Sequence, residues 1–178
     1  MSPRTRKRMD KLNLQKQSLL ASIRDLPGSK LALRPQADAW CVLDVVDHLM
    51  KVERAMVDEF ERNVALKNPV TLADRLRAYG VLGVMLSPLR VKVPASASST
   101  LPEVNSSFFE MVEQWTQFRS QMAQRIARFA PEELPFGVTR HPVSGWMDLP
   151  LALAFLSAHL QHHAYQVKRI QSAINCIR

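Results

Sequence analysis

The sequence has few cysteines, few glycines and no long apolar run. Its two cysteines, Cys41 and Cys176, are too few for a disulfide framework or a cysteine-rich zinc knuckle. Five glycines in 178 residues favour helices over turn-rich β structure. No segment is apolar and long enough to span a bilayer, and the basic N-terminus is not followed by the apolar core of a signal peptide. We therefore expect a soluble, cytoplasmic protein.

The formal net charge is +8, and part of it is concentrated at the N-terminus. Residues 1–11 contain several basic residues and a single acidic residue, Asp10. Such a segment is typical either of binding to an anionic partner or of a solvated terminus. Because no stacking platform or recognition motif accompanies it, we interpret residues 1–11 as a basic tail and residues 12–178 as one domain. We expect binding to neither nucleic acid nor membranes.

Helical periodicity divides the domain into four long amphipathic helices, predicted over residues 9–26, 42–66, 106–129 and 148–174. Asn105 or Ser106 is the expected N-cap of the third helix, and Asp148 lies at the start of the fourth. The long link over residues 67–105 is predicted to hold a short helix up to residue 85, an extended segment over 89–94 and a loop over 95–100. Residues 136–147 are predicted as a loop. The pattern predicts an all-α fold, a four-helix bundle with a long crossover between helices two and three.

The last predicted helix carries two histidines on its apolar stripe. His159 and His163 are separated by four positions, so their imidazoles lie one above the other. Two imidazoles in this relation can bind one divalent metal ion, and a facing helix can supply a third ligand. Leu160 stands where the H-E-x-x-H motif has its glutamate, which argues against zinc-peptidase chemistry.

Three motifs resemble those of the DinB/YfiT-like family. Residues 40–49 resemble its W-S-x-x-x-x-x-x-H-L pattern, residues 140–147 its h-P-x-x-G loop, and residues 159–166 its H-x-x-H-H-x-x-Q helix. The motifs occur in the order that the family has, and the resemblance spans residues 12–174. The sequence departs from the pattern at Cys41, where serine is usual, and a thiol caps a helix poorly.

The resemblance implies an up-down-down-up four-helix bundle, often a homodimer, with a divalent metal held by three histidines. Carried over residue by residue, the implied ligands are His48, His159 and His163. Imidazoles suit Zn, Ni, Fe, Mn or Co, and the bundle does not choose among them. Characterised members of the superfamily include transferases that use the low-molecular-weight thiols bacillithiol, mycothiol or glutathione, and a maleylpyruvate isomerase.

Three polar residues are candidates for the surroundings of this metal. His162 is rotated off the stripe by about one residue's turn, so we interpret it as a neighbour of the ligands, and as a ligand only if the helix is rotated. Gln166 could orient a ligand through its amide or bond to another helix. His141 could line the mouth of the pocket or be exposed on its loop.

Two residues with reactive or charged side chains are interpreted as structural. Arg119 falls in the middle of an apolar stripe, where Glu59 or Glu53 could pair with it or where it could anchor a substrate carboxylate. We favour the ion pair. Cys41 lacks a base three or four residues later, so we interpret it as a structural thiol and not as a nucleophile.

These features predict a metal-dependent enzyme that activates a low-molecular-weight thiol or water against a small-molecule substrate. The chemistry would be S-transferase-like or hydrolase-like, and beyond the metal ligands the sequence identifies no catalytic residue. The alternative is a non-catalytic helical module that docks a partner, with an incidental or structural metal site.

Overall fold

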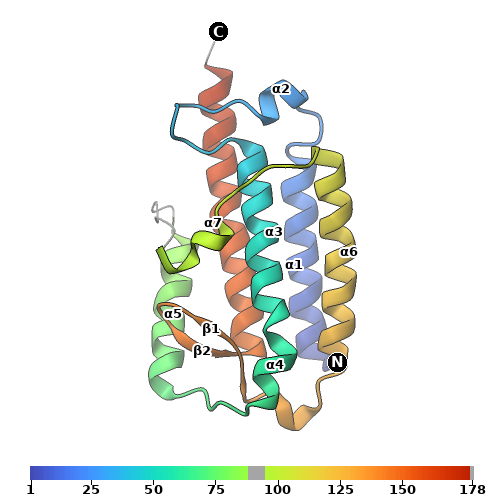
Figure 1. Cartoon of the computed structure of the whole chain (residues 1–178), viewed down its shortest axis with the longest axis vertical. Coiled ribbons are helices and arrows are strands. Elements are labelled where there is room, and N and C mark those ends of the chain that lie inside the picture. The colour runs from blue at the N-terminus through green and yellow to red at the C-terminus, as the bar shows by residue number, and fades with distance from the viewer. Residues whose placement is uncertain (88–94, 177–178) are drawn as a thin grey trace.

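The computed structural model describes residues 1–87 and 95–176, and it confirms the predicted bundle. Its four long helices are α1 (Pro3–Ala21), α3 (Val42–Asp58), α6 (Phe108–Ala127) and α7 (Leu149–Asn175). In Figure 1, α1 and α7 run upward while α3 and α6 run downward, which is the up-down-down-up order. None of the described helices combines the length and the apolar character that a membrane crossing needs.

Each long helix directs one apolar stripe into a shared core. On α3, Val45 and Leu49 are almost fully inaccessible to solvent. Burial of each such side chain stabilises the fold by about 1.5–3 kcal/mol. The largest fully buried side chains of the four helices include Leu12, Leu49, Trp115, Met122, Ile126, Leu153, Leu156 and Leu160.

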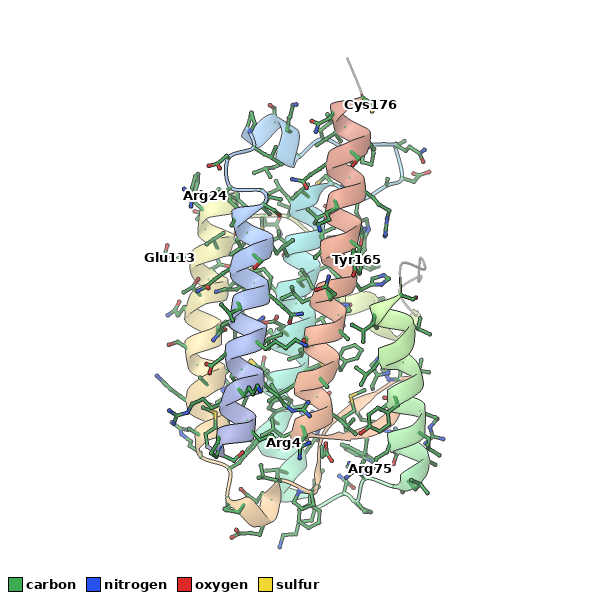
Figure 2. The ribbon with its side chains drawn as sticks, turned by 180° about the vertical axis from the view of Figure 1, so that it is seen from behind. Arg4, Arg24, Arg75, Glu113, Tyr165 and Cys176 are labelled. Carbon is green, nitrogen blue, oxygen red and sulfur yellow. The ribbon has the colours of Figure 1, made fainter. Side chains whose placement is uncertain are left out.

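The first helix begins earlier than the sequence suggested. α1 starts at Pro3, and Ser2 caps it by accepting a hydrogen bond from the Thr5 backbone N–H at 3.2 Å. Met9 is buried, and the Arg8 guanidinium donates to the Pro150 carbonyl at 2.8 Å where α1 lies beside α7 (Figure 2). Residues 3–11, expected to be a basic tail, thus form the first turns of α1, and the division of the chain into a tail and one domain stays a prediction.

The second predicted helix is divided at Glu59 into α3 and α4 (Phe60–Ala65). The Glu59 carboxylate accepts hydrogen bonds from the Thr139 hydroxyl at 2.9 Å and the Asn63 amide at 3.3 Å. The link that follows contains the predicted helix, α5 (Leu72–Leu86), and a 3₁₀ helix, η1 (Ala95–Thr100), where a loop was predicted. The predicted extended segment, 89–94, lies outside the described residues. A short α2 (Gly28–Leu31) follows α1.

The segment predicted as a loop before the last helix is a β-hairpin. After the 3₁₀ helix η2 (Pro131–Glu133), the strands β1 (Gly137–His141) and β2 (Gly145–Asp148) pair in antiparallel register. Gly145 has a φ of 80°, and a Cβ there would lie 2.2 Å from Asp74 Oδ1 on α5, so only glycine fits. The hairpin ends at Asp148, which caps α7 by accepting from the Leu151 backbone N–H at 2.9 Å.

The N-cap of α6 gives a direct test of helix capping, because three candidate residues precede the helix. Ser107, one residue after the predicted positions, accepts from the Glu110 backbone N–H at 3.3 Å, and the Glu110 carboxylate accepts from the Ser107 N–H at 2.7 Å. We expect Ser107→Ala to lower the free energy of unfolding by about 1 kcal/mol. Ser106→Ala is the matched control and should change it by less than about 0.5 kcal/mol. Urea denaturation measures both, and equal losses would place the cap elsewhere.

Candidate metal centre

Three imidazoles from two helices converge inside the bundle. His48 comes from α3, and His159 and His163 come from successive turns of α7. The Nε2 atom of His159 lies 3.3 Å from Nε2 of His48 and 3.1 Å from Nε2 of His163. All three side chains are buried, and one ligand atom from each lies within 4.8 Å of the others. The structure thus brings together the three residues that the resemblance implies as metal ligands.

Hydrogen bonds on the far side of two rings fix which nitrogen faces the centre. Nδ1 of His48 lies 2.7 Å from the Thr100 carbonyl oxygen, and Nδ1 of His163 lies 2.7 Å from Oε1 of Gln166. Both oxygens accept hydrogen bonds, so each Nδ1 carries the proton and donates. The Nε2 lone pairs of His48 and His163 therefore both point toward His159.

The three histidines have too few N–H donors to satisfy the three Nε2 atoms that face one another. A neutral imidazole has one N–H, and His48 and His163 use theirs on oxygen atoms outside the cluster. His159 has one N–H at most, and at Nε2 it can satisfy only one of the two facing lone pairs. At least one buried lone pair is left without a donor, whereas a cation at the centre accepts electron density from all three.

Burial keeps these histidines in the form that binds metals. Loss of solvent, together with the neighbouring His48, lowers the pKa of His163 to about 3, and the Gln166 hydrogen bond opposes this shift. Burial also lowers the pKa of His48, and it moves the pKa of His159 well below the ordinary value. Neutral imidazoles are the ligand form, so the group fits a divalent metal ion without first losing protons.

The three histidines line a cavity of about 880 Å³. The ring of Trp40 covers one side, with centroids 4.9 Å from His48 and 6.1 Å from His163, and Phe155 stacks on His159 at 5.5 Å. Apolar side chains of α3, including Val52 and Met56, and residues of the loop before α3 complete the wall. The cavity is large enough for a small-molecule ligand beside the histidines.

The three polar candidates around the centre all line this cavity. Gln166 makes the ligand-orienting contact described above. His162 is buried beside His163, at 5.3 Å between ring centroids, but it lies outside the three-histidine group. His141 is half-buried on β1, where its Nδ1 accepts from the backbone N–H groups of Val143 and Ser144, both at 3.2 Å. That arrangement leaves the proton of His141 on Nε2.

Arg119 lies away from the cavity, in the core between α1, α3 and α6. Its guanidinium donates through two nitrogens to the Glu53 carboxylate, with Nε at 2.6 Å, and through a third to Asn13. Glu53 also accepts from Trp115 Nε1 at 2.8 Å. The favoured ion pair is thus present, its partner is Glu53 and not Glu59, and Arg119 is not a pocket residue. The Glu53 carboxylate compensates the charge of Arg119. Removal of either partner would leave an unpaired buried charge, which costs about 3–5 kcal/mol.

The surroundings of Cys41 disfavour a nucleophilic role. Burial raises the pKa of its thiol, which keeps it protonated near neutral pH. The start of α3 is stabilised by Asp44, whose carboxylate accepts from the Cys41 backbone N–H at 2.9 Å and pairs with Arg34 at 2.8 Å. A carboxylate in the first turn thus supports this helix start, where the family pattern has a serine cap.

Sequence reasoning missed the partner that orients His48. Thr100 acts through its backbone carbonyl, so no side-chain pattern could mark it. Only its position in the long crossover between α3 and α6 pointed to this region. In Figure 1 the chain from η1 crosses in front of α7 and α3 on its way to α6.

Fold and site together define a helical bundle with a buried three-histidine group that could hold a metal ion. The sequence matches the DinB superfamily over residues 11–167, and the chain belongs to this superfamily. A search of curated proteins finds no match. Among solved structures, YfiT from Bacillus subtilis, a probable metal-dependent hydrolase with an unusual four-helix bundle topology, is similar with a TM-score of 0.67 and 14% identity. The match covers 98% of this chain and 90% of YfiT, and at this identity it shows a shared fold.

Metal binding by the three histidines is directly measurable. We expect the tag-free protein to bind one divalent ion per chain after equilibrium dialysis and elemental analysis. His159→Ala and His163→Ala should each reduce the bound metal to a small fraction, because two imidazoles hold an ion far less tightly than three. His162→Gln is the matched control and should retain the metal. Wild-type metal content in the His159→Ala, His163→Ala double variant would contradict the assignment.

The hydrogen bond from His163 to Gln166 should also affect metal affinity. We expect Gln166→Leu to weaken binding about tenfold, because the imidazole loses the acceptor that fixes its tautomer and orientation. Gln166→Glu keeps an acceptor and should bind at least as tightly as the parent. Competition with a chromophoric chelator measures both affinities. Equal affinity in the Leu variant and the parent would show that the hydrogen bond does not support the ligand.

Proposed function

We propose that the protein is a metal-dependent enzyme that activates a small nucleophile, a low-molecular-weight thiol or water, against a small electrophilic substrate. The observation that carries the proposal is the three-histidine group itself, which lies at the wall of a cavity and not in a sealed core. Three protein ligands leave coordination positions open, as in catalytic and not in structural metal sites. A divalent metal there would lower the pKa of a coordinated thiol or water toward neutrality.

The residues around the centre supply positioning and a hydrogen-bond donor. Gln166 and the Thr100 carbonyl hold two of the ligands in the tautomer that faces the cavity. His141 keeps its proton on Nε2, and burial lowers its pKa, so the neutral ring can donate a hydrogen bond to a substrate in the cavity. Trp40 and Phe155 exclude water from two sides of the ligands.

The site lacks the glutamate of zinc peptidases, so the chemistry we propose is thiol transfer or the hydrolysis of small substrates. The name of YfiT, a probable metal-dependent hydrolase, supports the use of water in a related fold. The resemblance to thiol-dependent members of the superfamily supports the use of a thiol. The homodimer expected from the same resemblance stays a prediction.

Turnover assays on metal-reconstituted protein separate these reactions. A chromogenic aryl halide with glutathione, cysteine or mercaptoethanol tests thiol transfer, and a nitrophenyl ester without thiol tests hydrolysis. We expect turnover in one assay, dependent on metal and reduced at least a hundredfold in His48→Ala. His141→Gln, which retains an N–H donor, should lose less activity than His141→Leu. Tight metal binding without turnover in either assay would favour the non-catalytic module.

A further inference from the structure

Arg169 is a cation in the wall of the cavity that the three histidines line. It lies on α7, six positions after His163, which is about 9 Å along the helix axis. Its side chain is half-buried and lines the same cavity. Burial is the main reason that the pKa values of His162 and His163 are lowered, and the charge of Arg169 lowers both further. The guanidinium thus shares the cavity with the histidines, and a small molecule in that cavity could contact both.

Arg169 differs from the other arginines at similar depth. In the described part of the chain, the remaining half-buried or buried arginines each donate to an oxygen atom at 2.6–2.8 Å: Arg8 to the Pro150 carbonyl, Arg75 to Asp148, Arg119 to Glu53 and Arg125 to Asp58. Arg169 makes no hydrogen bond or ion pair with any described residue. A partly desolvated guanidinium without a partner is energetically unfavourable. No contact within the described structure offsets this cost for Arg169.

Among the residues that the structure describes, no carboxylate in the cavity is free to neutralise Arg169. Glu59 lines the cavity, but its carboxylate is engaged by Thr139 and Asn63. Asp38 also lines it, is exposed, and forms no ion pair with Arg169 among the described contacts. The sequence over residues 88–97 contains no aspartate or glutamate. The charge is thus left available to a ligand.

We propose that Arg169 binds a carboxylate group of the small molecule that reacts at the three-histidine site. The inference rests on the proposed function, because it names the substrate class of that site. A single guanidinium offers two parallel donors and one charge, which match a carboxylate. A phosphate dianion usually also requires free backbone N–H groups, and those of the α7 interior are used in the helix. The anchoring role considered for Arg119 belongs to Arg169.

The first experiment uses the metal-free full-length protein, so that it is independent of metal and turnover. Titration with succinate, followed by the side-chain Nε–H signals of the arginines in NMR spectra, should shift the Arg169 signal saturably. Succinamide, its neutral analogue, should not shift it, and inorganic phosphate should bind more weakly than succinate. Tighter binding of phosphate than of succinate, or no response of Arg169 to succinate, overturns the proposal.

Variants then separate a specific anchor from general charge. Arg169→Gln should weaken succinate binding about tenfold, equivalent to about 1.4 kcal/mol. Lys168→Gln removes the same charge from the exposed neighbouring position on α7 and should leave the affinity within about twofold of the parent. The succinate affinity of Arg169→Lys should fall between those of the parent and Arg169→Gln, because lysine keeps the positive charge and lacks the two parallel N–H donors of the guanidinium. Equal losses in the Arg169→Gln and Lys168→Gln variants would overturn the proposal.

A second titration tests whether the carboxylate of a molecule bound at the three-histidine site contacts Arg169. In cobalt-loaded protein, the visible spectrum reports thiol binding, and mercaptopropionate should bind at least tenfold more tightly than neutral mercaptoethanol. Arg169→Gln should abolish this preference without changing the affinity for mercaptoethanol or the cobalt content. A preference that survives the substitution overturns the proposal, whereas failure of both thiols to bind, with the succinate result intact, contradicts only the use of a thiol.

Discussion

The site depends on three buried imidazoles that have too few N–H groups to satisfy the lone pairs facing one another. His48 and His163 donate their N–H groups to oxygens on the outer side, which turns two lone pairs toward His159. One neutral ring cannot satisfy both, and protonation is opposed because burial lowers the pKa of all three. A protein interior rarely keeps such a lone pair unsatisfied. A divalent cation resolves the conflict, and for this reason the arrangement supports a metal centre and not a histidine network of the core.

The bundle supplies this arrangement through elements far apart in the sequence. The hairpin ends at Asp148, the cap of α7, and Arg75 of α5 pairs with the same carboxylate at 2.7 Å, so the start of α7 is tied to the crossover. From that start, His159 and His163 follow at consecutive turns of one face. The crossover then returns Thr100 to the back of His48. The described end of the long link between α3 and α6 therefore belongs to the site, as a long connection inside a compact domain often does.

Much of the fold could be predicted from the sequence, because apolar side chains recur at helical spacing. The same spacing predicted that His159 and His163 lie on one face of a helix. The stripes predicted α3, α6 and α7, and the family pattern added His48 to the pair on α7. The hairpin was missed although Val138–Thr139 and Trp146–Met147 flank a turn, because strands this short carry a weak alternation signal. The division at Glu59 has no proline or glycine to mark it. It follows from hydrogen bonds to Asn63 and to Thr139, which is distant in the sequence.

The account depends most on three nitrogen ligands from His48, His159 and His163 around one ion. X-ray absorption spectroscopy of the zinc-loaded protein tests this directly. It should show a first shell of nitrogen and oxygen atoms at about 2.0–2.1 Å, with the outer-shell scattering of three imidazoles and no sulfur. The outer-shell signal should fall to two imidazoles in His48→Ala. A sulfur ligand at about 2.3 Å, or imidazole scattering unchanged in that variant, would contradict the account.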